Sequence, residues 1–255
     1  MIRKSLILAG ASALMLLLSG YAMANNSLVY DAEYYILEAQ NGKKWAAEDS
    51  ELDKKLAQLK EKFGQPPNII HIMWDDTAYG DVGIPAVQKI RGFETPNINK
   101  MAEEGILFTR MYTEVGCTPS RAAAVTGRLA VRSGMYNIGM LLESHGISKD
   151  EVTLAEVLSE EGYATAFHGK WHLGDQKQWL PTHHGYDSYF GIPYSNDMGV
   201  GNTRRNYPPL PVIEALDVIE EEPDQGYLTK RYTEKAVEFI EANQDQPFFL
   251  YLPQA

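Results

Sequence analysis

"TLAEVLSEEGYATAFHGKWHLGD", residues 153–175, holds a helix signal, a strand signal and a polar segment in direct succession. Thr153 stands three residues before Glu156, which is the spacing of a capping box and predicts a helix over residues 153–162. The apolar run at residues 163–168 has the length and composition of a buried strand. A helix followed at once by a buried strand is the repeating unit of an α/β fold.

The same alternation recurs along the rest of the chain. Thr95 and Thr118 are each followed by proline, as expected of an N-cap and a first helical residue. Strands are expected at residues 68–74, 106–112 and 247–252, and helices at residues 95–105, 118–127 and 226–243. This pattern predicts an α/β fold with a mostly parallel central sheet and helices on both faces. Residues 199–225, rich in proline, glycine and acidic residues, are expected to form an irregular surface excursion.

Length and charge limit the classes of function. The 255 residues suit one large α/β domain or two small ones, and the formal net charge is -11 at pH 7. An acidic chain of this kind is not expected to bind nucleic acid.

The N-terminus has the form of a signal peptide. Residues 1–24 run from a short basic segment through an apolar segment to Ala-Met-Ala, so cleavage is expected after Ala24. A membrane anchor is the alternative, but the apolar run is short for a span, and no stable membrane insertion is expected. The mature protein is therefore expected to be periplasmic or secreted. Residues 25–66 are expected to form a helical extension packed on the outside of the domain, ending at Pro66.

Two adjacent carboxylates follow the first expected core strand. Asp75 and Asp76 would repel each other unless a cation or an arginine compensates their charge. Oxygen ligands suit a hard cation, so Ca²⁺ is predicted here and Mg²⁺ is possible. A solvated acidic turn is the alternative.

The single cysteine of the chain precedes a predicted helix. Cys117 lies directly before Thr118, the expected N-cap, and the N-terminus of a helix attracts anions. Arg121 lies one turn further on, and its guanidinium group suits a tetrahedral oxyanion. A buried small hydrophobic residue or an intermolecular disulfide is the alternative reading of the thiol.

Lys170 and His172 follow the strand in the opening segment. In extended backbone both side chains would point the same way, and together they suit binding of an anion and movement of a proton. A surface loop without function is the alternative.

Taken together, these segments resemble the type I sulfatases of the alkaline phosphatase superfamily. Cys-Thr-Pro-Ser-Arg at residues 117–121 resembles their first signature, and residues 162–174 resemble their second. Residues 74–83 are similar to their N-terminal metal motif, and residues 183–197 to a segment of the arylsulfatases. The four motifs occur in the family's order, from about Pro67 to the C-terminus.

The resemblance implies roles for the candidate residues. Cys117 would be oxidised by a formylglycine-generating maturation enzyme, and one hydroxyl of the hydrated aldehyde would attack the sulfur of a small sulfate ester. The metal ligands would be Asp75, Asp76 and Cys117. Arg121 would hold the formylglycine, Lys170 would bind the sulfate group and His172 would hydrogen-bond the diol. Ser195 would contact sulfate; the catalytic residues are thus Cys117, Arg121, Lys170 and His172.

The sequence departs from the family's pattern at its C-terminal end. A later histidine, an Asp-Asn pair and a further lysine of the family have no counterpart before Ala255. Residues 67–255 are therefore expected to be the N-terminal part of a catalytic domain, truncated before its C-terminal part and inactive alone. The alternatives are a phosphate or phosphonate ester hydrolase of the same superfamily, or a truncated non-catalytic protein that binds an anion or a carbohydrate. The substrate stays open between aryl and carbohydrate sulfates.

Overall fold

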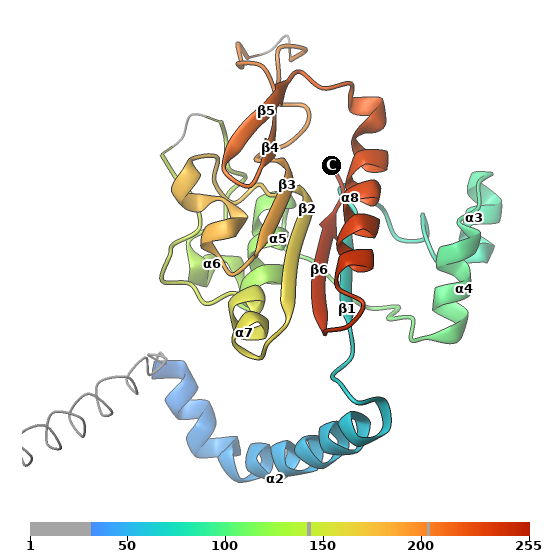
Figure 1. Cartoon of the computed structure of the whole chain (residues 1–255), viewed down its shortest axis with the longest axis vertical. Coiled ribbons are helices and arrows are strands. Elements are labelled where there is room, and N and C mark those ends of the chain that lie inside the picture. The colour runs from blue at the N-terminus through green and yellow to red at the C-terminus, as the bar shows by residue number, and fades with distance from the viewer. Residues whose placement is uncertain (1–31, 142–143, 203–204) are drawn as a thin grey trace, which may run out of the picture. The chain divides into compact units, whose positions relative to one another are not determined.

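The computed structural model describes residues 32–141, 144–202 and 205–255 (Figure 1). The chain divides into two units, residues 1–64 and residues 65–255, which are described separately. The predicted signal peptide lies outside the described residues.

The first unit contains one long helix, α2 (Ala32–Phe63), as the leucine spacing predicted. Leu52, Leu56 and Leu59 are exposed on it within this unit. Among the described residues, no helix is both long and apolar enough to cross a bilayer.

The second unit is built on a six-stranded mixed sheet with the order β1-β6-β2-β3-β4-β5. Its strands are β1 (Ile69–Met73), β2 (Ala164–Lys170), β3 (Ser188–Ile192), β4 (Pro211–Glu214), β5 (Asp217–Glu221) and β6 (Phe248–Pro253). The pairs β1–β6, β6–β2 and β2–β3 are parallel, and β4 and β5 add an antiparallel edge. The predicted, mostly parallel sheet is confirmed.

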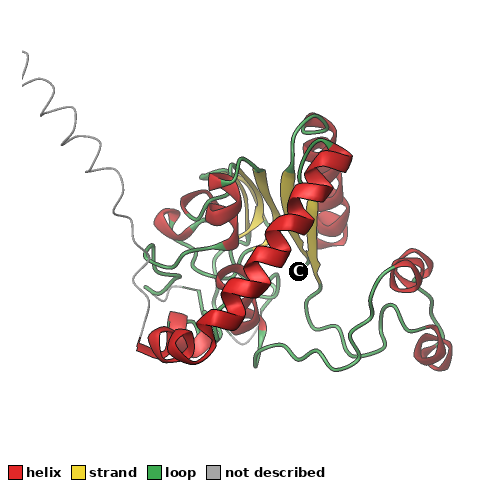
Figure 2. Ribbon diagram, turned by 90° about the horizontal axis from the view of Figure 1, so that it is seen from below, coloured by secondary structure: helices red, strands yellow, loops and turns green. Residues whose placement is uncertain are grey.

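Helices cover both faces of the sheet, as expected (Figure 2). Successive side chains of a strand point to opposite faces, so β6 serves two cores. Phe249 and Tyr251 pack in one core with residues of α5 (Cys117–Thr126) and α7 (Leu154–Glu160). Phe248 and Leu250 pack in the other core with residues of α8 (Leu228–Ala242). Burial on both faces explains why β6 is apolar throughout.

The capping box at the start of α7 forms as predicted. The Thr153 hydroxyl accepts a hydrogen bond from the Glu156 N–H at 3.2 Å, and the Glu156 carboxylate accepts one from the Thr153 N–H at 2.7 Å. Short helices complete the unit: α3 (Pro85–Arg91), α4 (Pro96–Glu104), α6 (Ala130–Ser133), η1 (Lys177–Trp179), η2 (Pro181–His183) and η3 (Gln225–Tyr227).

Two expectations about local structure are wrong. Residues 106–112 form no strand; the segment has no partner in the described sheet, and Ile106 and Tyr112 are strongly exposed. Conversely, the segment 199–225 is not irregular throughout, because it contains the hairpin of β4 and β5. The turn of this hairpin passes through Ala215, whose φ is 53°. Alanine rarely adopts a positive φ, so the sequence did not indicate the turn.

Candidate functional site

Four neighbouring parallel strands bring the candidate residues to one edge of the sheet. Strands β1, β6, β2 and β3 lie side by side and run the same way, so their carboxyl ends share that edge. Asp75 follows β1, Lys170 ends β2, Ser195 follows β3 and Gln254 follows β6. The carboxyl edge of a parallel sheet is where ligands bind in open α/β folds.

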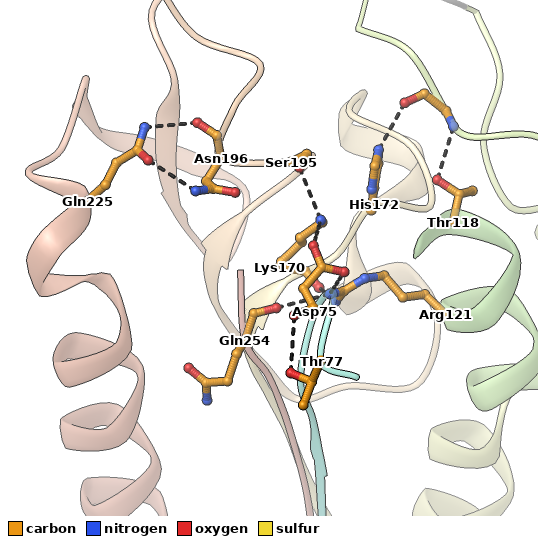
Figure 3. Close-up of polar contacts among 11 residues, drawn as sticks. Asp75, Thr77, Thr118, Arg121, Lys170, His172, Ser195, Asn196, Gln225 and Gln254 are labelled. Atoms are coloured by element: carbon orange, nitrogen blue, oxygen red, sulfur yellow. Dashed lines mark hydrogen bonds and ion pairs between the residues drawn. The ribbon is translucent and has the colours of Figure 1, made fainter. Parts of the chain in front are cut away.

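Asp75 is the centre of an ion-pair cluster (Figure 3). One carboxylate oxygen accepts a short hydrogen bond from the Lys170 ammonium, and the other lies 3.3 Å from Nη2 of Arg121. Partial burial by itself would raise the pKa of Asp75. The hydrogen bond and charge of Lys170, together with the charge of Arg121, outweigh burial and lower the pKa. Asp75 is therefore an anion near neutral pH.

Arg121 is held by backbone oxygens as well as by Asp75. Its side chain is 2 % exposed, and it donates a short hydrogen bond to the Lys170 carbonyl and one of 3.0 Å to the Gln254 carbonyl. The Gln254 N–H in turn donates to the Met73 carbonyl at 2.7 Å. Arg121 thus fastens helix α5 to the ends of β2 and β6. Sequence reasoning missed Gln254 because its contribution comes from the backbone.

Lys170 is fully buried although its ammonium is charged. Besides Asp75, it donates to the Ser195 hydroxyl at 3.1 Å, so the two residues predicted to contact sulfate lie side by side. Gly169, the residue before Lys170, has to be a glycine because β2 and β6 approach closely there. A Cβ on Gly169 would lie 1.8 Å from the Pro253 carbonyl oxygen.

His172 is buried close to this cluster but bonds elsewhere. Its backbone φ is 60°, so the chain is no longer extended there, and the expectation that His172 and Lys170 share an extended backbone is wrong. Nε2 lies 2.9 Å from the Gly139 carbonyl oxygen, whereas buried Nδ1 has no hydrogen-bond partner among the described residues. Burial, followed by the charge of Lys170, lowers the pKa of His172 to about 4. The imidazole is neutral at pH 7.

Cys117 and Asp76 stand outside this hydrogen-bond network. Cys117 is a half-buried free thiol and the first residue of α5, whose N-cap is Gly116. The prediction that Thr118 caps this helix is therefore wrong: its hydroxyl accepts from the Gly139 N–H at 3.0 Å. Asp76 is exposed with φ 49°. In the described part of the chain, no group of three or more His, Cys, Asp or Glu residues forms a metal cluster.

Comparison with known families identifies the arrangement. The family model described as Sulfatase matches residues 67–255. The chain belongs to the sulfatase family. The matched residues carry the whole sheet, the Asp75 cluster and helix α5, whereas α2 precedes the match.

Curated relatives of this sulfatase chain include arylsulfatases. Rat (Rattus norvegicus) Arylsulfatase G is 39% identical over 213 residues, covering 73% of this chain and 40% of the relative. Bovine (Bos taurus) Arylsulfatase A is 42% identical over 207 residues, with the same coverage of 73% and 40%. The crystal structure of PsFucS1 sulfatase from Pseudoalteromonas sp. aligns with a TM-score of 0.67 and 29% identity, covering 79% of this chain and 46% of that chain. The chain therefore spans about 40% of the length of these curated relatives.

A small open hollow of about 20 Å³, enough for a water molecule, adjoins His172 of the sulfatase chain. Apolar side chains supply much of its wall, with His145 and Asp175 among the polar ones. The lining includes Met135, Met140, Leu141, Pro193 and Tyr194. The hollow marks the polar and apolar side chains that surround His172, but it has no room for an aryl or sugar group.

Proposed function

We propose that this protein hydrolyses sulfate esters to an alcohol and inorganic sulfate, with a formylglycine hydrate made from Cys117 as nucleophile and a bound calcium ion. One observation carries the proposal. Lys170, Arg121 and Asp75 meet at the carboxyl edge of the sheet, and Arg121 comes from the first turns of the helix that Cys117 begins. Buried cations near a helix N-terminus suit a tetrahedral oxyanion.

The residues present fit part of a calcium site. Asp75 and Asp76 offer hard oxygen ligands, which suit Ca²⁺ and also Mg²⁺. The two cations paired with Asp75 lower its pKa, so it would be an ionised ligand, and Asp76 is exposed and open to a cation. Calcium takes about six to eight oxygen ligands, so these residues, together with the group formed from Cys117, would supply only some of them. When bound, the ion would stabilise negative charge on sulfuryl oxygens.

Two side chains are suited to binding the sulfate group. The Lys170 ammonium is desolvated, and its Ser195 partner offers a hydroxyl that can donate to a sulfate oxygen. A dry ammonium interacts more strongly with an anion than a hydrated one does. Lys170 would therefore exchange part of its contact with Asp75 for the ester's oxygens.

His172 is suited to accept a hydrogen bond from the nucleophile. A carbonyl oxygen can only accept, so the contact with Gly139 places the proton on Nε2 and leaves a lone pair on Nδ1. In this form the neutral ring would accept a hydrogen bond from the diol proposed at residue 117. Protonation of His172 at low pH would remove that capacity.

The names of the relatives support a choice of substrate class. Among the relatives are proteins named Arylsulfatase A, Arylsulfatase G and N-acetylgalactosamine-6-sulfatase. We propose an aryl or carbohydrate sulfate as the substrate, in line with these names. Maturation would require a formylglycine-generating enzyme, and export by the predicted signal peptide would place the protein in the periplasm or outside the cell.

The test starts with the residue at position 117. The protein, including any longer product of its reading frame, is expressed in a host that makes a formylglycine-generating enzyme. The mass of the peptide carrying residue 117 then reports an aldehyde or a thiol. We expect the aldehyde, and turnover of an aryl sulfate that Cys117→Ala abolishes. An unmodified thiol in that host, or faster turnover of the matching phosphate or phosphonate, would overturn the proposal.

A further inference from the structure

The hydroxyl of Thr118 has an unexpected partner. Thr118 is fully buried one residue after the proposed nucleophile. Instead of capping helix α5, its side-chain oxygen accepts the Gly139 N–H at 3.0 Å, across 21 residues of sequence (Figure 3). A buried hydroxyl that holds a distant backbone group fixes the position of that backbone.

The other backbone group of Gly139 is bonded to His172. The Gly139 carbonyl oxygen lies 2.9 Å from Nε2, so this one glycine joins the helix of the nucleophile to the histidine. Nδ1 of His172 is buried and has no partner in the described part of the chain. Only the Nε2–H form of the neutral ring satisfies the carbonyl while leaving Nδ1 as an acceptor.

Gly139 lies in a stretch that regular structure does not hold in place. Residues 134–141 form neither helix nor strand, and Tyr136 and Ile138 are exposed. No sheet ladder or helical hydrogen bond therefore sets the position of the Gly139 carbonyl. The Thr118 hydroxyl provides that anchor from helix α5, which Arg121 fastens to the sheet.

We propose that Thr118 is a positioning residue that acts through Gly139 to hold His172 in the tautomer with a bare Nδ1. The inference rests on the proposed function for its chemical meaning, because a bare Nδ1 is the form that would accept a hydrogen bond from the diol proposed at residue 117. It also places the nucleophile and the residue that orients His172 side by side on one rigid helical turn.

The test measures the histidine ring directly and needs no turnover. The 255-residue chain is labelled with ¹⁵N-histidine, and the ring signals of His172 are assigned by their loss in His172→Gln. We expect the Nε2–H tautomer with a slowly exchanging Nε2 proton in the wild type and in Thr118→Ser. In Thr118→Val we expect a roughly three- to tenfold fall in the tautomer ratio and roughly tenfold faster proton exchange, because one hydrogen bond is lost.

Folding of the variants is checked separately, so that a change in the tautomer of His172 is not confused with misfolding. Thr118→Ala removes the same hydroxyl without new branching, and both variants are compared with the wild type by near-UV circular dichroism. Unchanged tautomer and exchange in a folded Val or Ala variant would overturn the inference. Because Cys117 stays unmodified in this experiment, the result is independent of whether formylglycine forms or sulfate esters are hydrolysed.

Discussion

Replacing Asp75 by asparagine should cost far more stability than replacing its neighbour Asp76. Asp75→Asn leaves Lys170 and Arg121, whose side chains are 0% and 2% exposed, without their counter-charge. Removing one partner of a buried pair costs about 3–5 kcal/mol. The Asp75 side chain is 16% exposed, so water screens part of the loss and about 3 kcal/mol is expected.

Asp76→Asn makes the same chemical change at an exposed position with no ion pair among the described residues. It should stay within about 0.5 kcal/mol of the wild type. Urea unfolding followed by tryptophan fluorescence, in a chelator at pH 7, measures both variants. The Asp75 variant should also melt roughly 6–12 °C lower. Equal losses in the two variants, or a loss below about 1 kcal/mol for Asp75→Asn, would refute the reasoning.

The stabilisation that Asp75 provides should depend on pH in a direction set by its pKa. The pKa of Asp75 in the folded protein is lowered from 3.8, its ordinary value. Its stabilisation is therefore complete above that value and is lost as the pH falls through the lower, folded pKa. The difference between wild type and Asp75→Asn should be constant from about pH 7 to 5 and should shrink below about pH 4.

Three further predictions are tested by unfolding measurements. Burial lowers the pKa of His184 from 6.5 to about 4, so the free energy of unfolding of the wild type falls as the pH drops through that window. The His184 ring stacks on Trp171, and His184→Phe should reduce the loss of unfolding free energy between pH 7 and 4.5 by about 2 kcal/mol. An unchanged loss in the variant would contradict this. Arg121→Lys cannot keep both carbonyl contacts and should cost about 2–3 kcal/mol. Arg128→Lys is the control, because the Arg128 side chain is 44% exposed, and it should cost less than about 1 kcal/mol. Similar costs for the two variants would count against the Arg121 anchor. Calcium should raise the melting temperature of the wild type but not of Asp76→Asn, and an equal rise in both would exclude Asp76 as a ligand.

The placement of most charged site residues could be predicted from the sequence. Asp75 and Lys170 stand at the ends of two apolar runs, and parallel strands bring such ends together whatever the intervening chain does. Ser195 required the resemblance to the arylsulfatases, because the strand before it was not recognised. Asp76 and Cys117 were predicted as metal ligands, and their side chains lie outside the observed network.

The contacts that orient these residues could not be predicted. Thr118 has the sequence position of an N-cap, yet a competing partner 21 residues away takes its hydroxyl. Gln254 accepts the hydrogen bond of Arg121 through its backbone carbonyl. Every residue has such a carbonyl, so the residue type at position 254 could not predict this contact. The stretch at residues 106–112 shows the opposite failure. Its composition favours a strand, but strand formation depends on a partner ladder, which local sequence does not encode.

One helix start determines three features of the site at once. Cys117, Thr118 and Arg121 lie within two turns of α5: the first is the proposed nucleophile, the second the proposed anchor of His172 through Gly139, and the third pairs with Asp75. Arg121 bonds to the carbonyls at the ends of β2 and β6, and His172 lies two residues after the end of β2. These contacts therefore help to fix α5, with residue 117, relative to His172. Substitutions that loosen Arg121 should consequently disturb both the Asp75 cluster and the relation between residue 117 and His172.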